Sequence, residues 1–317
     1  DDAVVVVAKG YWQALKGLNA LSPKFTDGGH SAMSTASIYA AQTKLREAGK
    51  PDNTAGEGDV DAAFKAAGDK LVTGDFRVPF LHHAMMEPFA LTAHFKDGKL
   101  EMWGGLQDPI STRARAAKAA GLDMGDVIFN PMIMGGGFGR RFPDVVEIID
   151  QVALVAKQVP YPVKLVWSRE EELRHGTYRP QSSARLEATL DAEGRITAWR
   201  NDYVQRDNAE GEVGFIYAIP ATSRRHFAYQ SNQIDGPWRS VNATQIGFYT
   251  ESFMDELAAA AGEDPYQFRR KHLPEGSRHQ KVLDEVAQRS GWGTPLPEGT
   301  GRGIAIVESF GTIVAEV

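Results

Sequence analysis

The stretch Met134-Gly135-Gly136-Gly137-Phe138-Gly139-Arg140-Arg141 places four glycines within five positions and ends in two arginines. Glycine loses more backbone entropy on folding than any other residue, so a cluster of this kind needs a structural reason. The usual reason is that another group approaches the main chain closely and accepts hydrogen bonds from its N–H groups. The paired arginines indicate that this group is anionic. The stretch therefore predicts a loop that binds an anion.

The elements around the loop allow a second interpretation, an NADP-binding site. A predicted strand over residues 127–134 runs into the loop and a predicted helix over residues 144–157 follows it, as in phosphate sites at helix N-termini. The dinucleotide fingerprint G-x-G-x-x-G, counted from Gly135, places Arg140 where the third glycine is needed for helix–strand packing. Pro143 also moves the helix start, and with it the helix dipole, away from the loop. The corresponding function would be an NADP-dependent reductase. A third interpretation is a non-catalytic interaction domain, in which the glycine-rich turn is structural and binds no ligand.

The composition of the 317-residue chain excludes several classes of site. Hydrophobic residues make up 42% and charged residues 24%, which is ordinary for a globular protein with a sizeable core. The 41 acidic and 35 basic side chains leave a net charge of −6, which disfavours nucleic acid as a partner because phosphate neutralisation needs a basic surface. The absence of cysteine excludes disulfides, zinc–thiolate sites and an iron–sulfur cluster ligated by this chain.

His82 and His83, with Glu87 close by in the sequence, are the main candidates for a metal site. Adjacent residues of a strand point to opposite faces, so the two imidazoles cannot easily share one ion. No H-E-x-x-H motif occurs and no other histidine stands at ligand spacing. We therefore expect no metal held by side chains, and instead a histidine that hydrogen-bonds within the core while residues 85–88 shape a pocket floor.

The periodicity of the apolar residues predicts an α+β protein with several antiparallel strand pairs. Hairpins are expected across Lys96-Asp97-Gly98-Lys99, where Asp-Gly favours a tight turn, and across residues 191–194. Residues 51–59 and 206–236 are predicted to be irregular. Helices are expected over residues 11–21, 31–48, 60–67, 109–120, 144–157, 250–261, 265–273 and 280–290, and strands over residues 3–8, 71–79, 89–95, 100–106, 127–134, 163–167, 185–190, 196–204 and within 304–317.

Further motifs accompany the loop along nearly the whole chain. They are His82-His83-Ala84-Met85-Met86-Glu87-Pro88, Gln107-Asp108-Pro109 with Arg113, residues 162–171, Tyr178-Arg179-Pro180, Gly236-Pro237-Trp238-Arg239-Ser240-Val241 and residues 251–257. In this order they resemble the large molybdenum-cofactor subunit of the xanthine dehydrogenase/aldehyde oxidoreductase family. The double arginine points to the branch of isoquinoline 1-oxidoreductase β subunits and related membrane-associated aldehyde dehydrogenases.

The resemblance implies a fold of the molybdenum hydroxylase large-subunit type, with mixed and antiparallel sheets and packed helices. Residues 1–58 would be the tail of a hammerhead-like α/β domain, and residues 59–317 the truncated first part of a molybdopterin-binding domain. The cofactor of the full-length enzyme would be a molybdenum-pterin dinucleotide. Its reaction would oxidise an aldehyde or N-heterocycle with oxygen from water. Electrons would pass to a separate iron–sulfur subunit, and a cytochrome subunit is a further candidate partner.

By the same resemblance, the loop would lie beside the pterin and the metal's oxo face. The glycines would make room for it, Phe138 would exclude water and pack against the substrate ring, and Arg140 would contact the cofactor. As alternatives, Phe138 anchors the loop in the core, and Arg140 pairs with acidic side chains beneath the loop. The cofactor-binding residues expected on this basis are Gly136, Gly137, Phe138, Gly139 and Arg140.

The resemblance also implies two catalytic residues, Gln107 and Arg239. Gln107 follows a predicted strand, and its neutral amide can donate and accept hydrogen bonds at the same time. Arg239 would face the substrate and stabilise negative charge that develops on a carbonyl or ring nitrogen. The alternatives are a polar residue that ends a strand for Gln107, and a salt-bridged surface arginine for Arg239.

Two departures from the family pattern limit what is expected. Phe142 stands where xanthine-specific relatives carry an acidic residue, which favours aldehydes or apolar N-heterocycles over purines. The Gly-Glu-Pro motif with the family's catalytic base does not occur, so we expect this chain alone to be inactive. Because residues 3–8 and 304–317 both resemble strands cut in mid-sheet, we expect a central portion of a longer chain. A periplasmic or membrane-associated location is implied by the branch, and a cytoplasmic one otherwise.

Overall fold

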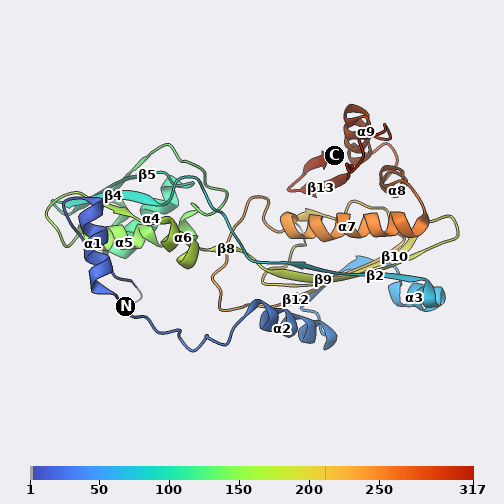
Figure 1. The fold of residues 1–317 in the computed structure, drawn as a ribbon, viewed down its shortest axis with the longest axis horizontal. Coiled ribbons are helices and arrows are strands. Elements are labelled where there is room, and N and C mark those ends of the chain that lie inside the picture. The colour runs from blue at the N-terminus through green and yellow to red at the C-terminus, as the bar shows by residue number, and fades with distance from the viewer. Residues whose placement is uncertain (1–2, 211) are drawn as a thin grey trace. The chain divides into compact units, whose positions relative to one another are not determined.

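The computed structural model describes residues 3–210 and 212–317, which form two compact units (Figure 1). The first unit comprises Asp1–Ser34, His82–Arg179 and Asn232–Trp238, and the second comprises Thr35–Leu81, Pro180–Ser231 and Arg239–Val317. The two units therefore interleave along the sequence. The expected boundary at residue 58 between two domain types stays a prediction, because a division into compact units does not test which domain type each unit is.

The first unit is built on a four-stranded mixed sheet. Its strands are β4 (Ala90–Lys96), β5 (Lys99–Gly104), β6 (Val127–Pro131) and β7 (Val163–Val166), in the order β6-β5-β4-β7. β4 and β5 form the predicted hairpin, β5 and β6 run parallel, and β7 is antiparallel to β4. Helices α4 (Pro109–Ala120) and α5 (Ile148–Ala156) pack on this sheet (Figure 1) and bury its apolar residues, among them Leu91, Leu100 and Met102.

The remaining elements of the first unit are short or exposed. Helix α1 (Tyr11–Leu21) has the predicted bounds, but it buries none of its residues, and Trp12 is 70% exposed. The short elements are α6 (Arg169–His175), β8 (Tyr178–Arg179) and the 3-10 turns η2 (Met124–Asp126) and η3 (Pro143–Val145), while β3 spans Leu81–His82.

The second unit contains a five-stranded sheet in the order β1-β12-β10-β9-β2. Helix α7 (Ala243–Ala261) packs on one face, and α2 (Thr35–Glu47) and α3 (Val60–Ala67) pack on the other (Figure 1). The strands are β1 (Asn53–Glu57), β2 (Leu71–Val78), β9 (Ser182–Leu190), β10 (Ile196–Gln205) and β12 (Ala221–Ala228). A smaller sheet and further helices complete the unit: β11 (Val213–Gly214), β13 (Ala305–Ser309), β14 (Thr312–Glu316), η1 (Gly68–Lys70), α8 (Pro265–His272) and α9 (Arg278–Ser290).

The two faces of the five-stranded sheet differ in chemistry because side chains alternate along each strand. The face under α7 is apolar, and its Trp199 and Leu186 are buried in one cluster with Phe253 of α7. On the other face, strand register aligns Asp75, Arg185, Asp202 and Arg225 across four strands. Arg185 Nη1 lies 3.0 Å from Asp75 Oδ2, and Arg225 Nε lies 2.6 Å from Asp202 Oδ1. Opposite charges on neighbouring strands stabilise this register.

The structure confirms the α+β fold class and corrects several predicted elements. Helix α2 begins at Thr35 rather than residue 31, α5 begins at Ile148 rather than residue 144, and β6 ends at Pro131 rather than residue 134. Residues 3–8 form no strand and are mostly exposed, so their apolar run is not a core strand. β1 lies within the predicted loop 51–59, and β11 and β12 lie within the predicted irregular segment 206–236. β1 is an edge strand with few apolar residues, so alternation could not indicate it. Helix α7 begins at Ala243 rather than residue 250.

Candidate functional site

The glycine loop follows β6, and its backbone requires glycine at several positions. Gly136 and Gly139 have φ values of +100° and +103°, which L-residues rarely adopt. A Cβ on Gly139 would lie 2.3 Å from the carbonyl oxygen of Pro237, and one on Gly135 would lie 2.5 Å from Glu87 Cβ. The glycines therefore permit close contact with neighbouring protein segments, in addition to any ligand.

Gln107 lies against the loop. The N–H of Gly139 donates to Gln107 Oε1 over 3.0 Å, and the N–H of Gln107 donates to the carbonyl of Arg141 over 3.0 Å. Asp108 caps α4 by accepting from the amides of Ile110 and Ser111, which fixes the backbone directly after Gln107. Within the described part of the chain, Gln107 Nε2 has no acceptor, and the residue is exposed. The structure thus brings Gln107 and the loop together, and leaves one amide donor at the surface.

Arg141 lies beneath the loop and is fully buried. Its Nη2 donates to the carboxylate of Glu87 over 3.0 Å and to the Glu87 carbonyl over 2.8 Å, while Nη1 donates to the Gly105 carbonyl over 2.7 Å. Glu87 Oε2 also accepts from the N–H of Gly135 over 2.8 Å. The sequence motif around Glu87 predicted a pocket floor and missed this pairing, because no spacing rule connects residues so far apart in the chain.

Arg140 is also fully buried. Its Nη2 lies 3.1 Å from Glu147 Oε2, and its Nη1 donates to the carbonyl of Val145. The guanidinium carbon stands 4.7 Å from the centre of the Phe89 ring and 5.9 Å from that of Trp167. These contacts favour the alternative in which Arg140 pairs with a carboxylate beneath the loop, and its contact with the cofactor stays a prediction.

The outer side of the loop is apolar. The Phe138 side chain is 45% exposed, so it is not packed into the core of the unit. Ile133, which precedes the loop, is 97% exposed, and Met86 of the adjoining segment is 89% exposed. The exposed ring of Phe138 can therefore meet an apolar ligand beside the amide of Gln107.

Arg239 belongs to the second unit, whereas its chain neighbour Trp238 belongs to the first. Arg239 is exposed, and its carbonyl accepts from Thr244 Oγ1 over 2.9 Å. The next two residues, Ser240 and Val241, have φ values of 69° and 46°. Such values are unusual for residues other than glycine, and above all for a β-branched one. They mark a strained turn, and strain of this kind gathers at ligand sites and switch regions.

His83 anchors the segment that leads to Arg239. Its Nε2 donates to the Pro237 carbonyl over 2.8 Å, and its ring lies 4.6 Å, centre to centre, from that of Trp238. Burial lowers the pKa of His83 to about 4, so the imidazole is neutral at pH 7. Across residues 3–210 and 212–317, His, Cys, Asp and Glu form no group that could hold a metal ion.

The strand order of the first unit disfavours the NADP interpretation. A dinucleotide-binding βαβ unit places its two strands side by side and parallel. Here β5 and β4 separate β6 from β7. Helix α5 begins at Ile148, well beyond Gly139, and its N-cap makes no side-chain hydrogen bond. The loop therefore lacks the adjoining helix N-terminus that such a site requires.

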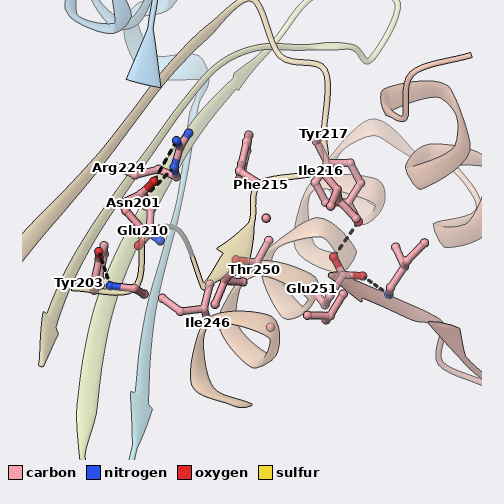
Figure 2. Close-up of a pocket in the computed structure, with 16 residues that line it drawn as sticks. Asn201, Tyr203, Glu210, Phe215, Ile216, Tyr217, Arg224, Ile246, Thr250 and Glu251 are labelled. Atoms are coloured by element: carbon pink, nitrogen blue, oxygen red, sulfur yellow. Dashed lines mark hydrogen bonds and ion pairs between the residues drawn. The ribbon is translucent and has the colours of Figure 1, made fainter. Parts of the chain in front are cut away.

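A cavity in the second unit lies between β10, β12, α7 and β13 (Figure 2). Ion pairs and hydrogen bonds surround it: Arg224 with Glu210, and Tyr217 with Glu251. Its volume is about 30 Å³, which is room for about two water molecules and not for an organic substrate.

Within the described ranges, no helix is long and apolar enough to cross a membrane.

The fold and the loop define a molybdopterin cofactor-binding domain. The chain belongs to this family, whose model matches residues 46–273. It is 28% identical over 254 residues to the β subunit of isoquinoline 1-oxidoreductase from Brevundimonas diminuta, covering 74% of this chain and 32% of that protein. It is also 28% identical over 261 residues to a nicotinate dehydrogenase subunit of Pseudomonas putida, covering 74% of this chain and 21% of that protein.

Solved structures confirm the expected fold type. Quinoline 2-oxidoreductase from Pseudomonas putida 86 superposes with a TM-score of 0.64 at 18% identity, over 75% of this chain and 35% of that chain. Aldehyde oxidoreductase from Desulfovibrio gigas gives a TM-score of 0.62 at 23% identity, over 74% of this chain and 29% of that chain. The chain thus spans about a third or less of the length of these relatives and structures.

Proposed function

We propose that residues 136–139 and Gln107 hold the molybdenum-pterin cofactor of a molybdenum hydroxylase that oxidises an aldehyde or an N-heterocycle. The observation that carries this proposal is the hydrogen bond from the Gly139 N–H to Gln107 Oε1, at 3.0 Å. It joins the loop to the exposed side-chain amide of Gln107, whose Nε2 can donate to a ligand.

The donors at this surface suit the oxygen-rich cofactor. In the part of the chain that the structure describes, the N–H groups of Gly136 and Gly137 donate to no residue. A Cβ on Gly137 would lie 2.7 Å from Gln107 Oε1, so only glycine leaves Gln107 in place. Two main-chain N–H groups and Gln107 Nε2 can therefore donate to oxo or pterin oxygens.

The bound cofactor would supply the two-electron redox chemistry, with water as the source of the oxygen atom. The chain's own residues would position and shield the reacting groups. Phe138 would exclude water and pack against an apolar ring, and Arg239 would stabilise negative charge on a carbonyl or ring nitrogen. Phe142 stands where xanthine-specific relatives carry an acidic residue, which favours an aldehyde or an apolar N-heterocycle over a purine.

The finer features of the holoenzyme are proposals as well. The cofactor would be the dinucleotide form, the electron acceptor a separate iron–sulfur subunit, and a cytochrome a further partner. Arg140 and Arg141 would hold the loop in shape from beneath, with Arg140 as the candidate for a cofactor contact. Residues 1–58 would belong to a hammerhead-like domain, and residues 59–317 to the first part of the molybdopterin-binding domain.

Cofactor analysis provides the experiment. The chain is produced in a host that makes the molybdenum cofactor, and molybdenum, oxidised pterin fluorescence and nucleotide released by acid are measured per chain. We expect near-stoichiometric metal and pterin, and their loss in Gly137→Val. Absence of both from a folded chain would contradict the proposal. The same sample is expected to oxidise no aldehyde with an artificial acceptor, because the chain lacks the Gly-Glu-Pro glutamate.

A further inference from the structure

An arginine-lined cavity lies in the second unit between helix α2 and two strands of the five-stranded sheet. These are β2, which lies at one edge of the sheet, and its neighbour β9. Its volume is about 290 Å³, near the lower end of the range of about 300–1,000 Å³ that ligand sites occupy. The charged and polar side chains that line it are Thr43, Arg46, Glu47, Asp75, Arg77, Ser183 and Arg185. We call it the arginine pocket.

Strand register places four of these side chains on one face of the sheet. Asp75 pairs with Arg185 across β2 and β9, and Arg77 pairs with Ser183 two positions further on. Residues two apart on a strand share a face. Helix α2 covers this face and contributes Arg46. The pocket is therefore formed by strands and a helix, and not by a surface loop.

Asp75 orients two of the three guanidinium groups. Its carboxylate lies 3.0 Å from Arg185 Nη1 and 3.4 Å from Arg46 Nη1. Arg77 forms no ion pair within residues 3–210 and 212–317, and its guanidinium carbon stands 4.9 Å from the centre of the Tyr39 ring. Arg185 Nε also lies 3.5 Å from Glu187 Oε1, so Arg46 and Arg185 both have carboxylate partners, whereas the guanidinium of Arg77 has none in the described part of the chain.

Ser183 provides the second, independent observation. The residue is only 5% exposed, and its hydroxyl has no hydrogen-bond partner in the described part of the chain. Buried hydroxyl groups are almost always hydrogen-bonded. The residue lines the pocket, while its Oγ is closed off from solvent; when the side chain turns toward the pocket, the hydroxyl can donate to a ligand that also accepts from Arg77.

We propose that the arginine pocket binds a phosphate group, either inorganic phosphate or the phosphate of a small ester. The planar guanidinium of Arg77 matches two oxygens of a tetrahedral anion, and Ser183 Oγ donates to a third. Arg46 and Arg185 stay paired with Asp75, and Arg185 also with Glu187, so Arg77 is the cation that pairs with the phosphate. The proposal does not depend on the molybdenum cofactor, because none of these residues belongs to the glycine loop.

Titration of the cofactor-free 317-residue chain with inorganic phosphate and with adenosine 5′-monophosphate tests the proposal, by calorimetry and ³¹P NMR in low-salt buffer. We expect saturable one-site binding that weakens with added NaCl. Arg77→Gln should weaken it about tenfold or more, and Ser183→Ala about threefold or more, since each removes a charge-assisted hydrogen bond. Arg289→Gln is the matched control, because Arg289 is an exposed arginine paired with Glu285, and should bind as the parent does.

The two probes separate the sources of the phosphate. Binding of inorganic phosphate that competes with the ester supports a site for the phosphate group itself, and binding of the ester alone supports an ester site. No saturable binding of either probe up to about 10 mM, a very weak affinity, would overturn the proposal. So would equal affinities for the parent, Arg77→Gln and Ser183→Ala chains whose circular dichroism and unfolding midpoints match.

Discussion

Glu87 and Arg141 form an ion pair of 3.0 Å directly beneath the glycine loop, and the same carboxylate oxygen accepts the N–H of Gly135 over 2.8 Å. The guanidinium is fully buried, whereas the carboxylate is 39% exposed. Burial lowers the pKa of Arg141, although the charge of Glu87 opposes this shift. The pair ties the loop to the motif of residues 82–88 and so determines the loop's position.

Removing this pair should loosen the loop. We expect Glu87→Gln to lower the free energy of unfolding by about 1–3 kcal/mol, because it leaves a buried guanidinium without its counter-charge while water reaches the carboxylate position. Chemical denaturation measures this loss, and hydrogen exchange at Gly135 should accelerate. An unchanged exchange rate at Gly135 would show that Glu87 does not hold the loop.

The close approach at Gly139 should make this position intolerant of any side chain. Gly139→Ala combines a φ of +103° with a Cβ 2.3 Å from the Pro237 carbonyl oxygen, and we expect a loss of about 3 kcal/mol. Gly121→Ala is the matched control, because Gly121 has φ +64° and open space around its Cβ; it should lose about 1 kcal/mol. Equal losses in thermal unfolding would contradict the close contact.

His83 should make stability depend on pH. Its pKa is about 4 in the folded chain, because of burial, against 6.5 for the free side chain. The unfolded chain therefore binds more protons between these values, and stability falls as pH drops from about 6.5 to about 4, by at most about 3 kcal/mol. His83→Gln should flatten this dependence. An NMR titration of the His83 ring with a midpoint near 6.5 would refute the prediction.

Gln107 should matter for the cofactor and little for the fold. Its amide is exposed and makes one neutral side-chain hydrogen bond, to the Gly139 N–H, so Gln107→Ala should cost less than about 1 kcal/mol of stability. If it holds the cofactor as proposed, molybdenum and pterin per chain should fall severalfold. Full occupancy in Gln107→Ala would exclude that role, while denaturation curves separate it from misfolding.

Two adjacent arginines of α8 offer a paired comparison in the second unit. Arg269 is fully buried, and its Nε forms an ion pair with Glu251 Oε2 over 2.8 Å. Glu251 Oε1 also accepts a hydrogen bond from the Tyr217 hydroxyl over 2.6 Å. Arg270 pairs with Asp284 at the surface. Arg269→Met should cost about 3–5 kcal/mol, since the carboxylate of Glu251 is left buried without its counter-charge, and Arg270→Met less than about 1 kcal/mol. Similar unfolding midpoints for both variants would contradict this difference.

Local signals in the sequence determined the bounds of several elements and the family of this protein. The run Asp108-Pro109 and the later Gly121 bound α4, and Asp97-Gly98 turns the hairpin of β4 and β5, since capping and turn chemistry act between near neighbours. The glycine loop and its companion motifs identified the family, now confirmed over residues 46–273. The sequence did not predict edge strand β1, because its mostly polar residues pair through the backbone and show no alternation of apolar and polar side chains.

Only the tertiary structure decided which distant groups meet. Glu87 reaches Arg141 and Gln107 reaches Gly139 because β5 runs parallel to β6 and antiparallel to β4, so the segments before β4 and after β5 and β6 lie at the same end of the first unit's sheet. Arg46, Arg77 and Ser183 share a pocket because β2 pairs with β9 beneath α2. Such contacts depend on strand order and register, which long-range packing selects and which no short stretch of sequence encodes.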